Sequence, residues 1–200
     1  MLSHINIYNL IFIDIETVPD WSSYQQLSET MKELWAIKHA TLKIDNETAE
    51  EGYLKRAGVY SEFSKIICIS VGFFHADKDK QRKFRVKTIF NDDEKTLLDD
   101  FLKMLHKSFA EAERFHFCGH NIREFDLPFI CRRLLINGFE LPEIMDFSGK
   151  RPWEMQDVDT LQLCRGVAFL ENDHYGAKAA ENHSINRNIP YWSAYPKTAA

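Results

Sequence analysis

Near its N-terminus the chain has a short apolar segment that contains acidic residues. Residues 10–15 read Leu-Ile-Phe-Ile-Asp-Ile. Such a nearly continuous run of β-branched and aromatic residues is typical of a central strand that is buried on both faces. The segment therefore predicts a strand in the interior of a sheet, with Asp14 and Glu16 at its end.

The pattern after this segment predicts further strands and helices. Polar residues with apolar side chains at helical spacing come next, and we interpret them as a helical insertion after the first strand. The expected elements are that insertion at 22–55, strands at 66–74 and 82–90, a helix at 94–109, a strand at 114–119, and a helix at 125–137 ended by Gly138. Asn91 or Asp92 is expected to cap the helix at 94–109. This order predicts an α/β fold in which a mixed β-sheet is flanked by helices.

The size and composition of the chain fit one globular domain. Its 200 residues are enough for one sizeable core, and 44% of them are hydrophobic. The net charge of −5 differs from that of proteins that coat nucleic acid, because their affinity comes largely from basic residues that neutralise phosphates. Any contact with nucleic acid is therefore expected to be local, brief or mediated by metal ions.

The cysteines and the hydrophobic segments indicate a cytoplasmic, soluble protein. The four cysteines are widely spaced and form no Cys-x-x-Cys pair, so we expect reduced thiols and no zinc site. The first residues lack the features of a signal peptide. No apolar run approaches the roughly 20 residues that span a bilayer, so we expect no membrane partner.

Asp14 and Glu16 suggest a metal site. They are two residues apart on the predicted strand, so their side chains project to the same side. Two neighbouring carboxylates resist ionisation unless a cation compensates them, and hard ions such as Mg²⁺ or Mn²⁺ prefer oxygen ligands. The alternative is that the strand end is acidic simply because it meets solvent.

A second polar cluster occupies residues 119–126, Gly-His-Asn-Ile-Arg-Glu-Phe-Asp, where a predicted strand ends and a helix begins. Asn121 and Asp126 supply an amide and a carboxylate five residues apart. Either side chain could cap the helix by accepting a hydrogen bond from a free backbone N–H group. Taken alone, the cluster favours a helix cap.

Together the two clusters resemble the exonuclease motifs of the DEDD superfamily. Residues 12–17, Phe-Ile-Asp-Ile-Glu-Thr, are similar to the first motif. Residues 121–126, Asn-Ile-Arg-Glu-Phe-Asp, are similar to the second motif in the form typical of family B polymerase proofreading domains. The resemblance covers about residues 10–163 and looks closest to stand-alone bacterial relatives of those domains. It implies a ribonuclease H-like fold.

The resemblance also implies a function. The chain would be a 3'-5' exonuclease that hydrolyses phosphodiester bonds at the 3' end of DNA, preferably single-stranded. Asp14, Glu16 and Asp126 would bind two Mg²⁺ or Mn²⁺ ions about 4 Å apart. Thr17 and Asn121 would lie near the terminal nucleotide, and Phe125 would either pack beneath it or fill the core. The partner would be nucleic acid, with DNA expected over RNA, although no residue identifies a contact to a ribose 2'-hydroxyl.

One part of the family pattern is missing. The family has a fourth acid, an aspartate that follows a tyrosine by four residues or a histidine by five on a late helix. This spacing does not occur near the C-terminus of the chain. Asp157 and Asp159 lie upstream of that position, and we interpret Asp159 as structural or as supporting a ligand. Glu171 or Asp173 could substitute for the missing acid.

We therefore divide the chain into a ribonuclease H-like exonuclease domain, 1–163, and an atypical tail, 164–200, that is shortened, frameshifted or diverged. If the tail is genuine, metal affinity and rate should be weakened, since one ligand and the group that orients the water are gone. The alternative function is a catalytically impaired nucleic-acid-binding module of the same fold.

Overall fold

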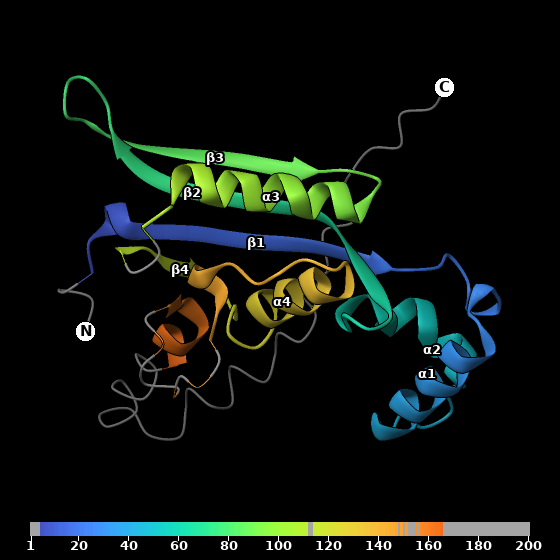
Figure 1. The fold of residues 1–200 in the computed structure, drawn as a ribbon. Helices are drawn as coiled ribbons and strands as arrows, with labels where there is room; N and C mark the ends of the chain where they lie inside the picture. Colours follow the sequence, from blue (N-terminus) through green and yellow to red (C-terminus); the bar gives the residue numbers. More distant parts are fainter. Residues whose placement is uncertain are drawn as a thin grey trace, which may run out of the picture. The chain divides into compact units, whose positions relative to one another are not determined.

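A five-stranded mixed sheet forms the centre of the described structure (Figure 1). The computed structural model describes residues 5–111, 114–147, 149, 151, 155 and 157–165. The strand order is β3-β2-β1-β4-β5, and β1 pairs antiparallel with β2 and parallel with β4. The strands are β1 Leu10–Pro19, β2 Ser64–Ala76, β3 Arg82–Phe90, β4 His116–Gly119 and β5 Val158–Asp159. The α/β fold with a mixed sheet is confirmed.

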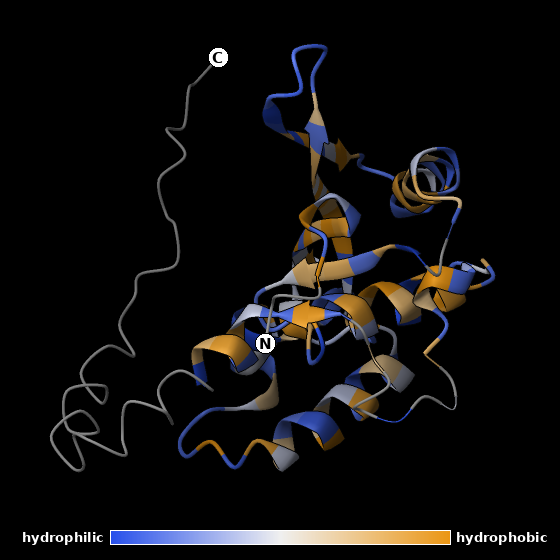
Figure 2. Ribbon diagram, turned by 90° about the vertical axis from the view of Figure 1, so that its left-hand side faces the viewer, coloured by the Kyte–Doolittle hydropathy of each residue, from blue (hydrophilic) through white to orange (hydrophobic). Residues whose placement is uncertain are grey.

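The two faces of β1 differ. Ile11, Ile13 and Ile15 are buried in the main core, to which α3 (Glu94–Ser108) and α4 (Asp126–Ile136) contribute their apolar residues. Seen end-on in Figure 2, α3 has one hydrophobic and one hydrophilic side. On the opposite face Asp14 and Glu16 are exposed. β1 is central as predicted, but the expectation that both of its faces are buried is wrong.

The helical insertion after the first strand is confirmed. It contains α1 (Glu29–Thr41) and α2 (Ala49–Arg56), which form a separate pair beyond one end of β1 (Figure 1). The pair has its own small core around Trp35, whose indole Nε1 donates a hydrogen bond to the Ala49 carbonyl at 2.7 Å. Because this core is distinct from that of the sheet, the insertion is a satellite of the main layer structure.

A buried ion pair joins the two helices that cover the sheet. Arg133 on α4 donates to both carboxylate oxygens of Glu94 on α3, with Nε distances of 2.9 and 3.0 Å. Glu94 also accepts the backbone N–H of Ile66 at 2.7 Å, and Arg133 donates to the Ser61 carbonyl at 2.9 Å. Bidentate pairs of this kind fix geometry as well as charge. The network therefore sets the position of α4 against β2 and α3.

Residues 1–160 form one compact unit. Beyond it the structure describes 161–165, which continue a helix begun at Thr160. The predicted division at residue 163 therefore stays a prediction, and most of the predicted tail lies outside the described residues. None of the helices in the described part of the chain has the length and hydrophobicity that crossing a membrane requires.

Candidate active site

The two acids of the first motif lie on the exposed face of β1. Asp14 pairs in register with Ser70 of β2, and Glu16 pairs with Cys68. Because side chains alternate along a strand, both carboxylates project to the same side. The register shifts between Glu16 and Thr17, so the regular alternation ends there. The prediction that the Asp14 and Glu16 side chains project to the same side of the strand end is therefore confirmed.

Asp126, the first residue of α4, lies against the backbone of the same strand. Its Oδ1 atom accepts a hydrogen bond from the Ile15 N–H at 3.1 Å, and its side chain is buried. The parallel pairing of β1 with β4 ends at Phe12, which leaves the Ile15 N–H without a strand partner. A buried N–H group needs an acceptor. The carboxylate of Asp126 supplies it, at the residue that lies between Asp14 and Glu16 in the sequence.

The turn that carries Asp126 to this place has two special backbone positions. A Cβ atom on Gly119 would lie 2.7 Å from the Ile13 carbonyl oxygen, so a side chain there would force β4 away from β1. Asn121 has a φ of 61°, in the left-handed region that asparagine tolerates better than most residues. Its carbonyl accepts the Phe125 N–H at 3.0 Å. The chain therefore reverses within a few residues between β4 and α4.

Asp159 on β5 holds this turn from the other side. Its Oδ1 accepts the Asn121 N–H at 2.9 Å, and its Oδ2 accepts the Arg123 N–H at 3.2 Å. The Arg123 guanidinium pairs with Asp157 and donates to the Asp157 carbonyl at 2.8 Å. These contacts support the interpretation of Asp159 as structural. No local sequence pattern predicts the Arg123–Asp157 pair, since its members are 34 residues apart.

The carboxylates interact electrostatically. Burial raises the pKa of Asp126 to about 6, and the negative charges of Asp14 and Asp159 add to this effect, while the Ile15 N–H opposes it. A raised carboxyl pKa means that the ionised form lacks compensation. Asp14 and Asp126 are thus close enough to repel each other, which is the condition that a divalent cation relieves.

Among the described residues, no three acidic, histidine or cysteine side chains lie together closely enough to hold one metal ion. Asp14 and Asp126 interact, but Glu16 is not among the charges that raise the Asp126 pKa. The donors nevertheless fit Mg²⁺ or Mn²⁺ chemically, because they are all carboxylate oxygens. Glu171 and Asp173 lie outside the described residues. The ligand set of Asp14, Glu16 and Asp126 therefore stays a prediction.

The three residues predicted near the substrate have different surroundings. Thr17 donates its hydroxyl to the Gly58 carbonyl at 2.6 Å, so this group is already engaged. Asn121 forms the turn through its backbone groups. Phe125 packs against the main core, with its ring centroid 5.4 Å from that of Phe129. Of the two roles kept open for Phe125, the contacts favour filling the core.

Comparison with known families identifies the chain. Residues 5–163 match the model of the exonuclease domain of family B DNA polymerases. No curated protein matches the chain. The matched segment begins before β1, ends after β5, and includes both acidic motifs. The strand order, the position of Asp126 and this match agree, and the chain belongs to the family of DNA polymerase B exonuclease domains.

Proposed function

We propose that the chain is a metal-dependent 3'-5' exonuclease that removes nucleotides from the 3' end of single-stranded DNA. The observation that carries the proposal is the hydrogen bond from the Ile15 N–H to Asp126, at 3.1 Å. It brings the acid of the second motif to the strand that bears the acids of the first. Within a family of exonuclease domains, this convergence supports a shared site for Asp14, Glu16 and Asp126.

Asp14, Glu16 and Asp126 would hold Mg²⁺ or Mn²⁺, and the bound ions would activate a water molecule and stabilise the leaving 3'-oxygen. The chain's own contribution is to fix the carboxylates. The Ile15 N–H orients Asp126, and Asp159 holds the turn that precedes it. Asp14 and Glu16 are open to solvent, so a nucleotide can approach them from the uncovered face of β1.

A second candidate function is a nucleic-acid-binding module without turnover. One observation favours it: the described residues contain no complete metal-binding group. The sequence also lacks the fourth acid at its expected spacing. In this case the protein would bind a 3' end but would not cleave it, because incomplete coordination weakens both metal affinity and activity.

End-labelled single-stranded DNA incubated with the protein and Mn²⁺ separates the two functions. The exonuclease predicts a ladder that shortens from the 3' end and disappears with Asp14→Asn. Binding without any ladder at high protein concentration would reject the exonuclease and leave the binding module. An RNA strand of the same sequence tests the expected preference for DNA, which fails if RNA is degraded faster.

A further inference from the structure

β3 concentrates positive charge in a protein that is acidic as a whole. The strand carries Arg82, Lys83, Arg85 and Lys87 and no acidic residue, whereas the chain has 25 basic and 30 acidic residues. It is also the edge strand of the sheet, since β2 is its only neighbour in the described strand order. Among the described strands, the one with the most lysines and arginines is therefore at an edge of the sheet, where a long polyanion can reach it.

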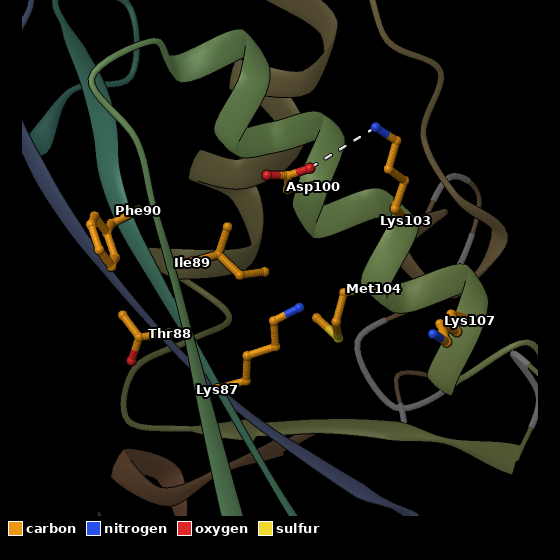
Figure 3. Close-up of a pocket in the computed structure, with 8 residues that line it drawn as sticks. All are labelled: Lys87, Thr88, Ile89, Phe90, Asp100, Lys103, Met104 and Lys107. Atoms are coloured by element: carbon orange, nitrogen blue, oxygen red, sulfur yellow. Dashed lines mark ion pairs between the residues drawn. The ribbon is translucent and has the colours of Figure 1, made fainter.

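A cavity of about 390 Å³ lies between β3 and α3, and we call it the β3–α3 groove. Lys87 extends into it from β3 toward α3 (Figure 3). Lys103 and Lys107 line it from α3. Lys103 is neutralised by Asp99 at 2.6 Å, with Asp100 at 4.0 Å. Lys87 and Lys107 form no ion pair within the described part of the chain, so two ammonium groups at the groove are left uncompensated.

The strand register relates β3 to the acids of β1. Asp14 pairs with Ser70, which pairs with Thr88; Glu16 pairs with Cys68, which pairs with Phe90. Neighbouring strands lie about 4.8 Å apart, so Thr88 and Phe90 are roughly 10 Å from the acids on the same face of the sheet. Both residues border the groove, but their side chains lie on the face of β3 opposite to Lys87, which points toward α3. A strand of nucleic acid that leaves the acids across this face therefore reaches β3 within a few nucleotides.

An exposed aromatic ring lies on that path. The side chain of Phe90 is 75% exposed, and no other aromatic ring of the described residues stacks on it. Phe84, on the same face of β3, is 48% exposed and contacts Phe12 and Phe74. Proteins that bind single strands combine a basic groove with aromatic side chains on which bases stack. β3 has both features: Lys87 points toward α3 into the groove, and Phe90 lies on the opposite face of the strand.

We propose that the β3–α3 groove binds the phosphate backbone of a single-stranded polynucleotide upstream of its 3' end. Lys87 and Lys107 contact phosphates, and Phe90 stacks on a base where the strand passes over the edge of the sheet. The direction of the strand rests on the proposed function, because the 3' end is assigned to the acids of β1. The binding itself does not depend on cleavage.

The test compares two double variants with the same change in charge. Lys87→Gln/Lys107→Gln removes the free charges of the groove, and Lys32→Gln/Lys43→Gln removes two charges of the helical insertion. Binding of a labelled oligothymidylate is measured by fluorescence anisotropy in EDTA, between about 50 and 200 mM salt. The groove variant should bind roughly tenfold more weakly at the low-salt end. Its slope of log affinity against log salt should fall by about 1.4, since each lost phosphate contact on a single strand contributes about 0.7.

Phe90→Ala gives an independent readout. Loss of base stacking should weaken binding by at least about fivefold but leave the salt slope unchanged. The control double variant should keep both the affinity and the slope. Equal affinity and slope for the groove variant and the control would overturn the proposal. Displacement of the oligonucleotide by polyglutamate as readily as by unlabelled oligonucleotide would also overturn it, because the groove would then be a general polyanion site.

The outcomes for the groove and for the proposed function are distinguishable. If the wild type never cleaves DNA but the groove variant binds it more weakly, the exonuclease activity is rejected and binding at the groove is supported. If the wild type produces a ladder and the groove variant binds and cleaves like the control, the groove fails and the exonuclease stands. Thermal unfolding of each variant checks whether the substitutions leave the fold intact.

Discussion

Two buried acids of this protein have opposite electrostatic surroundings. Glu94 is surrounded by donors, with a bidentate arginine and the Ile66 N–H. Asp126 accepts one backbone N–H from Ile15 and lies near the like charge of Asp14, so its pKa rises to about 6. The first arrangement satisfies a charge inside the fold. The second leaves a charge uncompensated beside an exposed carboxylate, as a site for a cation would. The difference distinguishes a structural acid from a candidate metal ligand without reference to the sequence motif.

Arg133→Leu should give the largest effect on stability. It leaves the Glu94 carboxylate buried without its partner, and breaking a buried pair in this way costs about 3–5 kcal/mol. Urea unfolding measures the loss. Arg132→Leu, at the exposed neighbouring position of α4, is the control and should change stability by less than about 0.5 kcal/mol.

A double variant tests whether the loss of stability comes from the unpaired charge of Glu94. Glu94→Gln/Arg133→Leu keeps an acceptor for the Ile66 N–H but removes both charges, so it should recover part of the lost stability. If the double variant is no more stable than Arg133→Leu, the loss does not come from an unpaired charge, and the contrast with Asp126 disappears.

Asp126→Asn should raise the stability of the protein, whereas Arg133→Leu lowers it. The folded-state pKa of about 6 lies above the ordinary aspartate value of 3.8, so the folded state holds its proton more tightly than the unfolded state. The resulting stability is fully present below pH 3.8 and is lost as pH rises through about 6. An asparagine avoids this loss while its amide oxygen still accepts the Ile15 N–H.

In EDTA at pH 8, Asp126→Asn should therefore be more stable than the wild type by up to about 3 kcal/mol, with little difference at pH 4. Unfolding by urea at both pH values measures this, and Asp45→Asn in the helical insertion is the control. The variant should also produce no ladder. A variant that is less stable than the wild type at pH 8 would show that Asp126 is compensated, as Glu94 is.

Mn²⁺ should stabilise the wild type. A ligand at 100 times its dissociation constant contributes about 2.7 kcal/mol when it binds only the folded state. The gain should shrink below pH 6, because protons then compete for Asp126. Asp14→Asn should abolish it. Differential scanning fluorimetry at several Mn²⁺ concentrations measures the shift, and an equal shift in wild type and Asp14→Asn would place the ion elsewhere.

Local patterns in the sequence predicted several elements well. β3 has the predicted bounds, and α4 ends as expected with Gly138 at a φ of 80°, where the Phe139 N–H returns to the Leu134 carbonyl. Alternation and a C-terminal glycine are local signals, so no tertiary information is needed. The prediction of Asn91 or Asp92 as the N-cap of α3 is wrong. The N-cap is Asp93, whose carboxylate accepts the Thr96 N–H at 2.9 Å.

The remaining features depend on distant contacts. Burial of β1 on both faces was expected because Phe12 and the isoleucines form one apolar run, but only the isoleucine face meets α3 and α4. The Glu94–Arg133 pair joins residues 39 apart, and no local pattern reports it. For the candidate site, the motifs identified Asp14 and Asp126, whereas the reason that they meet, the free N–H of Ile15, appears only when the strands are paired.

Gly52→Ala should have the smallest effect, and it tests whether the helical insertion and the acidic site are independent. A Cβ atom at position 52 would lie 2.5 Å from the Nε2 atom of His39 and 2.9 Å from a carboxylate oxygen of Glu47. Glu47 has a pKa lowered to about 2 by hydrogen bonds from Arg56, His39 and Lys55, so the substitution disturbs a paired cluster. Overpacking of this kind costs about 1–3 kcal/mol.

The two-core structure predicts that this cost is confined to the insertion. Gly52→Ala should lower the thermal midpoint, while Leu54→Ala at an exposed position of the same helix should not. Neither substitution touches β1 or α4, so cleavage rates and the Mn²⁺ shift should equal those of the wild type at a temperature where both proteins are folded. A loss of cleavage in Gly52→Ala alone would mean that the insertion positions the acids, since α1 and α2 would then be coupled to β1 through the residues that follow its register shift.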